Sequence, residues 1–169
     1  VAPILERVYE EGKQRGRLPT TLTEGIISIL YKKKERDDPR NYRPITLLNG
    51  DYKIMMRILT QRMNQAVLQF VSRDQNGFVP DAFICENLMR LQMIQAVIEG
   101  EDSEALYLFL DMEKAFDRCS WDFLMAGLKK LNFGEEFIKF IKLAYSHDTP
   151  PTRQLYVNGY LGPRFSLGS

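Results

Sequence analysis

The spacing of apolar residues along the chain predicts five helices. Apolar side chains recur every three to four residues, so that each stretch has one face to bury, in residues 3–16, 49–71, 83–99, 120–131 and 135–144. Local signals agree with the last two stretches. Ser120 is a good N-cap, and the carboxylates of Glu135 and Glu136 suit the positive end of a helix dipole.

Other stretches predict strands. Residues 26–31 and 105–110 are short continuous apolar runs, which are typical of buried strands. Residues 153–168 predict a β-hairpin that turns at Asn158-Gly159. Helices and strands together indicate a mixed α+β fold.

Composition is that of a folded protein of one medium domain or two small subdomains. The chain has 169 residues, of which 44% are hydrophobic and 27% are charged. No apolar run approaches the ~20 residues of a membrane span, and no secretory signal is present. The chain begins at Val1 rather than at Met, so we expect a piece of a longer protein.

Cysteine and histidine usage argues against a zinc or multi-histidine metal site. Cys85 and Cys119 are far apart and form no CxxC pair, and His147 is the only histidine. Free cysteines of this kind are typical of a reducing compartment. We therefore expect an intracellular location, in the cytoplasm or the nucleus.

Charge is spread unevenly along the chain. Residues 1–62 hold 13 Lys/Arg and 8 Asp/Glu, a net charge of +5, whereas residues 63–169 hold 10 and 14, a net charge of −4. The basic part is densest in KKKERDDPRNYR, from Lys32 to Arg43. Two interpretations are open: a solvated loop, or a binding site for phosphate groups.

The stretch YLFLDMEKAFDR places Asp111 directly after the apolar run of residues 105–110. A carboxylate at the tip of a strand is well placed to hold a metal ion. The backbone N–H groups that follow, up to Ala115, can face a triphosphate. The alternative is that Asp111 caps or pairs locally and that Phe116 belongs to the core.

Five segments in this order resemble a known family. They are ISILYK at residues 27–32, NYRPITLLN at 41–49, DQNGF at 74–78, FLDMEKAFDR at 109–118 and LYVNG at 155–159. Together they resemble the reverse transcriptases of non-LTR (LINE-type) retrotransposons. The resemblance implies an incomplete right-hand polymerase. Residues 1–104 would form the fingers region with an N-terminal helix, and residues 105–169 a partial palm with a return to a fingers hairpin.

The resemblance also implies roles for particular residues. Asp111 would be the first metal-binding aspartate and hold both Mg²⁺ (or Mn²⁺) ions, and Phe116 would exclude a 2′-hydroxyl. Lys32 and Arg43 would grip the incoming deoxynucleoside triphosphate, and Glu113, Lys114 and Ala115 would line its path. Contacts with nucleic acid would come from Lys33, Lys34, Gln75, Gly77 and Phe78. For Glu113 and Lys114 a solvated ion pair remains the alternative.

The implied activity is RNA-directed DNA synthesis, with an RNA template, a DNA primer and deoxynucleoside triphosphates as partners and no membrane partner. The family's second catalytic element, an Ala-Asp-Asp hairpin, does not occur in residues 1–169. We therefore expect this chain alone to be inactive and to self-associate through uncovered sheet edges, with residues 153–168 as the exchanging segment. The alternative is a non-catalytic remnant of a retroelement that binds nucleic acid or protein.

Overall fold

The computed structural model describes residues 2–101 and 103–168, which form two compact units. The first unit comprises Val1–Leu59 and Asp117–Ser169, and the second comprises Thr60–Phe116. No helix of the described residues is long and apolar enough to cross a membrane.

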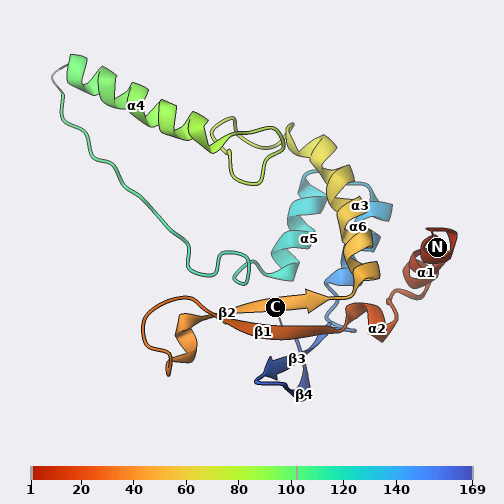
Figure 1. The fold of residues 1–169 in the computed structure, drawn as a ribbon. Coiled ribbons are helices and arrows are strands. Elements are labelled where there is room, and N and C mark those ends of the chain that lie inside the picture. Colours follow the sequence, from red (N-terminus) through yellow and green to blue (C-terminus); the bar gives the residue numbers. More distant parts are fainter. Residues whose placement is uncertain (1, 102, 169) are drawn as a thin grey trace. The chain divides into compact units, whose positions relative to one another are not determined.

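Both helices and strands are present, so the α+β class predicted from the sequence is confirmed (Figure 1). In chain order the elements are α1 (Ala2–Arg15), α2 (Thr20–Thr23), β1 (Gly25–Tyr31), the 3₁₀ turn η1 (Pro39–Asn41), β2 (Tyr42–Leu48), α3 (Gly50–Val67), α4 (Ile84–Gly100), α5 (Trp121–Lys130), α6 (Glu135–Ala144), β3 (Thr152–Val157) and β4 (Tyr160–Ser166).

The first unit contains a four-stranded sheet with the strand order β2-β1-β3-β4. β1 pairs antiparallel with β2, from Gly25 opposite Leu48 to Tyr31 opposite Tyr42, and parallel with β3. β3 and β4 form the predicted hairpin. Asn158 and Gly159 both have positive φ, 50° and 88°, which the tight turn between right-twisted strands requires.

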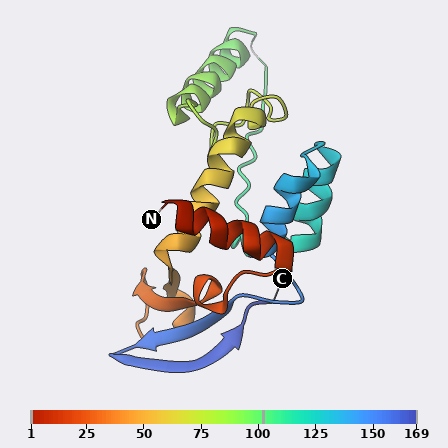
Figure 2. The same ribbon diagram turned by 90° about the vertical axis from the view of Figure 1, so that its right-hand side faces the viewer.

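Helices of the first unit bury its apolar core. The core side chains are Tyr9, Leu18, Leu22, Met55, Leu59, Leu128, Ile138, Ile141, Leu143 and Ala144. Figure 2 shows α1 beside α6, which it contacts. The Tyr9 hydroxyl also donates a hydrogen bond of 2.7 Å to the carbonyl of Asp51 in α3.

The expected helix signals of the first unit are largely confirmed. Ser120 caps α5 by accepting a hydrogen bond from the Phe123 N–H (3.2 Å), and α6 begins at Glu135. Asn49 directly precedes α3, but its side chain donates to the Thr21 carbonyl (2.9 Å). It therefore ties α3 to α2.

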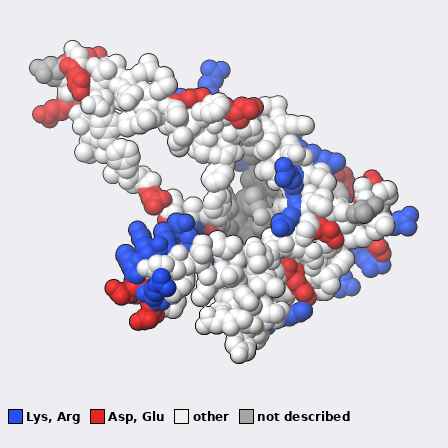
Figure 3. All heavy atoms as spheres, in the orientation of Figure 1, with Lys and Arg blue, Asp and Glu red and all other residues white. Residues whose placement is uncertain are grey.

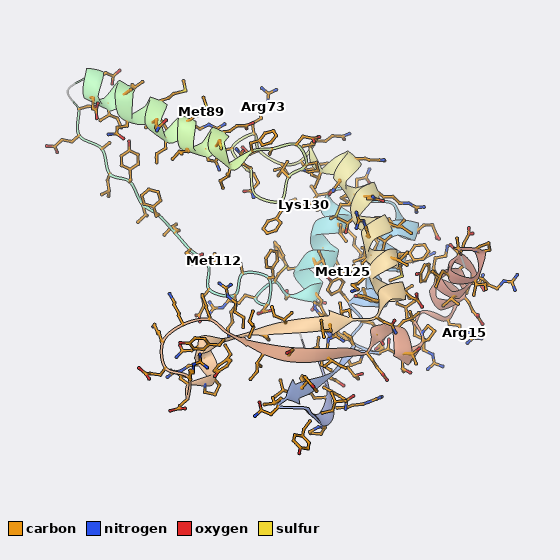
Figure 4. All side chains as sticks on the ribbon, viewed as in Figure 1. Arg15, Arg73, Met89, Met112, Met125 and Lys130 are labelled. Carbon is orange, nitrogen blue, oxygen red and sulfur yellow. The ribbon has the colours of Figure 1, made fainter. Side chains whose placement is uncertain are left out.

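In the second unit, α4 is held by an ordered loop. The amide of Asn76, which is buried, donates to the Phe83 carbonyl (2.8 Å) at the start of α4. Arg90 pairs with Asp74 at 2.7 Å. The predicted helix is confirmed, but most of its apolar side chains stay exposed, among them Met89 at 61% (Figure 4).

The predicted strand at residues 105–110, with Asp111 at its tip, is wrong. The segment is extended but irregular, and its side chains project to either side of the backbone as far as Met112 (Figure 4). Leu106, Leu108 and Leu110 are each at least 75% exposed. All four strands of the described residues belong to the first unit, so nothing in the second unit can complete the backbone hydrogen bonds of a strand here.

Candidate functional site

A basic hairpin extends the β1–β2 pair of the first unit. We use this name for residues 32–43, the loop between the two strands together with Arg43 at the start of β2. The last ladder pair is Tyr31 with Tyr42, and the Lys32 N–H then donates to the Asn41 carbonyl (2.9 Å). The hydrogen-bonded ladder therefore carries the first lysine of the run rigidly at the end of the sheet.

Two tyrosines hold the backbone of the basic hairpin. The Tyr31 hydroxyl donates to the Lys34 carbonyl (2.5 Å), and the Tyr42 hydroxyl donates to the Arg36 carbonyl (2.8 Å). The two rings meet edge to face at 5.7 Å, and the Arg36 guanidinium lies 4.8 Å from the centre of the Tyr31 ring. The loop thus has a defined conformation.

Within the basic hairpin, charge is only partly neutralised. Asp38 caps η1 and pairs with Arg40 at 2.9 Å, and hydrogen bonds from Arg40 hold the pKa of the Asp38 carboxyl below its usual value. Across the described residues, Lys32, Lys33 and Arg43 have no carboxylate partner, and all three are exposed. Figure 3 shows Lys and Arg gathered at this end of the sheet.

Arg43 lies opposite Leu30 in the ladder, so both side chains are on the same face of the sheet. Lys34 has a positive φ of 71° and turns the chain just after the strand. Cations with fixed backbone positions and no partner are suited to phosphate groups, because no existing ion pair has to be broken first.

In the second unit, Asp111 leads into a turn formed by residues 113–118. Asp111, Glu113, Lys114 and Ala115 are all exposed, and Lys114 has a positive φ of 53°. The residues expected to line a triphosphate path therefore follow Asp111 in a tight turn and not in a helix.

Phe116 and Phe78 are brought together. Their rings meet edge to face at 5.5 Å, although they are 38 positions apart in the sequence. The Gln75 side chain donates to the Gly77 carbonyl (3.0 Å) and shapes the loop that presents Phe78. Phe116 is 78% exposed, so the alternative interpretation that it belongs to the core is wrong.

Asp111 does not form a metal site with its neighbours. Residues 2–101 and 103–168 contain no group of three or more histidine, cysteine, aspartate or glutamate side chains that could hold a metal ion. A Mg²⁺ ion keeps several waters besides one or two carboxylates, and a pair of ions needs more than one. The side chains present supply one ligand of the expected pair of ions and do not fit the pair by themselves.

The residues expected to bind the triphosphate are divided between the two units. Lys32 and Arg43 belong to the first unit, and Asp111 and Phe116 belong to the second. Their joint action on one nucleotide stays a prediction, as does the division into fingers and palm after residue 104.

A buried arginine that was not singled out from the sequence holds the start of β1, at the end of that strand away from the basic hairpin. Arg153 on β3 is 7% exposed and donates to the carbonyls of Thr23 (2.7 Å) and Thr152 (2.8 Å). Its Cδ and Nε lie 3.1 Å from the position that a Cβ on Gly25 would occupy. Arg153 therefore packs against Gly25, the first residue of β1, at the opposite end of the strand from Lys32.

Burial shifts the pKa values of two neighbouring side chains, Arg153 and Tyr52. Burial lowers the pKa of Arg153, and burial raises the pKa of Tyr52 to about 12. From the sequence alone, Arg153 would be interpreted as a phosphate ligand or as a surface residue. Its role as a buried anchor depends on a contact with Thr23, 130 positions away in the sequence.

Comparisons with known proteins identify one family. Residues 31–165 match the family described as reverse transcriptase (RNA-dependent DNA polymerase). The chain is 30% identical over 146 residues, 86% of its length, to an uncharacterized 149 kDa protein of transposon TX1 from Xenopus laevis. It is 33% identical over 110 residues, 63% of its length, to a probable RNA-directed DNA polymerase from transposon BS of Drosophila melanogaster.

A further relative is a retrovirus-related Pol polyprotein from the type-1 retrotransposable element R2 of Popillia japonica, with 27% identity over 140 residues, 82% of this chain. The matched parts span only 11%, 12% and 19% of these three relatives. The family model covers most of the chain and includes Arg43, Asp111 and Phe116. The resemblance seen in the sequence is confirmed, and the chain belongs to the reverse transcriptase (RNA-dependent DNA polymerase) family of retrotransposons.

Proposed function

We propose that this chain supplies the triphosphate-gripping hairpin and the first catalytic aspartate of a retroelement RNA-directed DNA polymerase. The observation that carries the proposal is the basic hairpin, in which Lys32 and Arg43 have no carboxylate partner within residues 2–101 and 103–168, while Tyr31 and Tyr42 hold the backbone. Family membership supports a nucleoside triphosphate as the anion that these cations meet.

Lys32 and Arg43 have different tasks in this proposal. The guanidinium of Arg43 offers two parallel N–H donors to one phosphate group, whereas Lys32 contributes a compact point charge. Both cations offset the negative charge of the triphosphate as it binds, and because the ladder fixes their backbone little chain entropy is lost.

Asp111 is the proposed metal ligand. In the complete polymerase, bound Mg²⁺ would supply positive charge for phosphoryl transfer from the triphosphate to the primer. Asp111 contributes one carboxylate from the extended segment that leads into the turn, and the other ligands come from the rest of the polymerase. Glu113, Lys114 and Ala115 follow along the path of the triphosphate.

Phe116 is proposed as the residue that selects deoxyribose. Its edge-to-face contact with Phe78 limits the freedom of an otherwise exposed ring, so that the ring presents a defined wall. A sugar with a 2′-hydroxyl would need space that this wall occupies. Lys33, Lys34, Gln75, Gly77 and Phe78 are proposed to contact the RNA template and the DNA primer.

Binding of thymidine triphosphate to residues 1–169 tests the proposal. In isothermal titration calorimetry at low salt, the Lys32→Gln/Arg43→Gln variant should bind at least about tenfold more weakly than the unchanged chain, since each lost charge-assisted contact is worth about 1.5 kcal/mol or more. The matched control is Lys53→Gln/Arg57→Gln, which removes the same two charges from the exposed side of α3. Equal weakening in both variants would show that only net charge matters and would refute the site.

A further inference from the structure

A second cationic cavity lies in the first unit, apart from the basic hairpin. It has a volume of about 550 Å³ and is lined by the C-terminal parts of α1 and α6, by α5 along its length, and by the loop that follows α6. Four lysines line it together with an aromatic and an imidazole side chain: Lys13, Lys129, Lys139, Lys142, Trp121 and His147. We infer that this cavity, the lysine pocket, binds a single-stranded nucleic acid through a phosphate group and a base.

Two of the four lysines are neutralised by glutamates. Lys13 pairs with Glu10 (2.7 Å) and with Glu136 (3.1 Å), and Lys139 pairs with Glu136 (2.7 Å). The hydrogen bond from Lys139 holds the pKa of Glu136 below its usual value, which agrees with a carboxylate that is already paired with two lysines. These ion pairs form the wall of the lysine pocket and leave little charge for a ligand.

Lys129 and Lys142 are the cations left for a ligand. Both are exposed, and among the described residues neither has a carboxylate partner. Two carboxylates also line the lysine pocket: Asp122 lies 3.5 Å from Nε2 of His147, and Asp148 lies in the loop after α6. Asp122 is 91% exposed at its side chain, so water screens its effect on the lysines.

A simpler role accounts for only part of this arrangement. Lys129 and Lys142 lie in the last turns of α5 and α6, where a positive charge stabilises the negative end of a helix dipole. That role needs no cavity and no aromatic residue. Here Lys129 and Lys142, from two antiparallel helices, line one pocket together with Trp121.

Trp121 is what favours nucleic acid over a simple anion. It is half-buried, with Tyr145 edge-on at 5.9 Å and His147 tilted at 5.2 Å. Proteins that bind single strands combine cations for the backbone with aromatic rings on which bases stack. The lysine pocket offers both, whereas an acidic peptide would use the lysines alone.

The sequence itself provides the probe. Trp121 is the only tryptophan and His147 the only histidine of the chain, and both line the lysine pocket. A change in intrinsic tryptophan fluorescence therefore reports on this pocket and on no other part of residues 1–169. An oligouridylate of about 12 nucleotides, long enough for typical single-strand sites, is the ligand to titrate.

The expected result is a saturable change of Trp121 emission. Lys129→Gln/Lys142→Gln should weaken binding at least about fivefold and reduce the slope of log K against log salt by about 1.4, since each phosphate contact on a single strand contributes about 0.7. The matched control is Lys53→Gln/Lys130→Gln, in which Lys130 is the neighbour of Lys129 outside the pocket. The control should bind within twofold of the unchanged chain, and circular dichroism should show all three proteins equally folded.

Other outcomes would overturn the inference. Equal losses in both double variants, or no emission change on binding, would show that the lysine pocket takes no strand. Uridine monophosphate or polyglutamate binding as tightly as the oligonucleotide would reassign the pocket to a free nucleotide or to an acidic chain. The inference goes beyond the proposed function, and the two fail separately because thymidine triphosphate binding depends on Lys32 and Arg43.

Discussion

Replacing Arg153 by methionine should destabilise the first unit more than any comparable change on its sheet. The side chain is 7% exposed and donates to the carbonyls of Thr23 and Thr152 at 2.7 and 2.8 Å. A hydrogen bond from a charged donor is worth about 1.5–3 kcal/mol, and the half-buried Thr23 carbonyl would lose its partner. Part of this is offset, because burial disfavours the charged guanidinium, as the lowered pKa of Arg153 shows. We therefore expect a net loss of about 2–4 kcal/mol in the free energy of unfolding.

Urea unfolding followed by the fluorescence of Trp121 measures this loss, because that residue lies in the first unit. The control is Arg164→Met on β4. Arg164 pairs with Glu24 at 2.5 Å, but its side chain is 59% exposed, and exposed pairs contribute about 0.2–1 kcal/mol. If Arg153→Met costs no more than Arg164→Met, the anchoring role of Arg153 is wrong. A gain in stability would show that the desolvation of the guanidinium outweighs its hydrogen bonds.

Three further predictions follow from particular side chains. Burial raises the pKa of Tyr52 from 10.0 to about 12, so the contribution of Tyr52 to stability is complete below pH 10 and is lost as pH rises toward 12. Urea unfolding midpoints across this range should therefore fall for the unchanged chain and fall less for Tyr52→Phe. Leu108 is 75% exposed in an unpaired apolar segment, so Leu108→Lys should lower the mass of associated species in light scattering. A clean monomer of the unchanged chain at high concentration would count against association through this segment. In a polymerase that carries this chain, Phe116→Ala should keep DNA synthesis but admit ribonucleotides in primer extension, and an inactive variant would point to a structural role for the Phe78 contact.

Local signals in the sequence were sufficient for most of the first unit. Ser120 caps α5, Asn158-Gly159 forms the turn, and the apolar run of residues 26–31 lies within β1, because each depends on a few neighbouring residues. The parallel pairing of β1 with β3 joins Gly25 to Arg153, and no local pattern encodes such a distant pairing. The burial of Arg153 depends on that pairing, so it could not be predicted either.

Residues 105–110 show the opposite failure. Their apolar run is a strong strand signal, yet a strand also needs neighbours for its backbone, and the second unit has none among the described residues. For the candidate site, the sequence predicted the cations of the basic hairpin, but not that Tyr31 and Tyr42 hold its loop. The lysine pocket was missed because its lysines come from separate helices and only meet once α5 and α6 pack together.

Primer extension on an RNA template, by a polymerase that includes residues 1–169, tests the central claim most directly. Asp111→Asn keeps the size of the side chain and removes the charge that the metal ions need. The matched change Glu104→Gln lies at the start of the same exposed segment. Metal ions contribute several kcal/mol to such transition states, so Asp111→Asn should reduce kcat on the order of a thousandfold, while Glu104→Gln should leave it unchanged. Equal activity of the two variants would contradict the assignment of Asp111 as the first catalytic carboxylate.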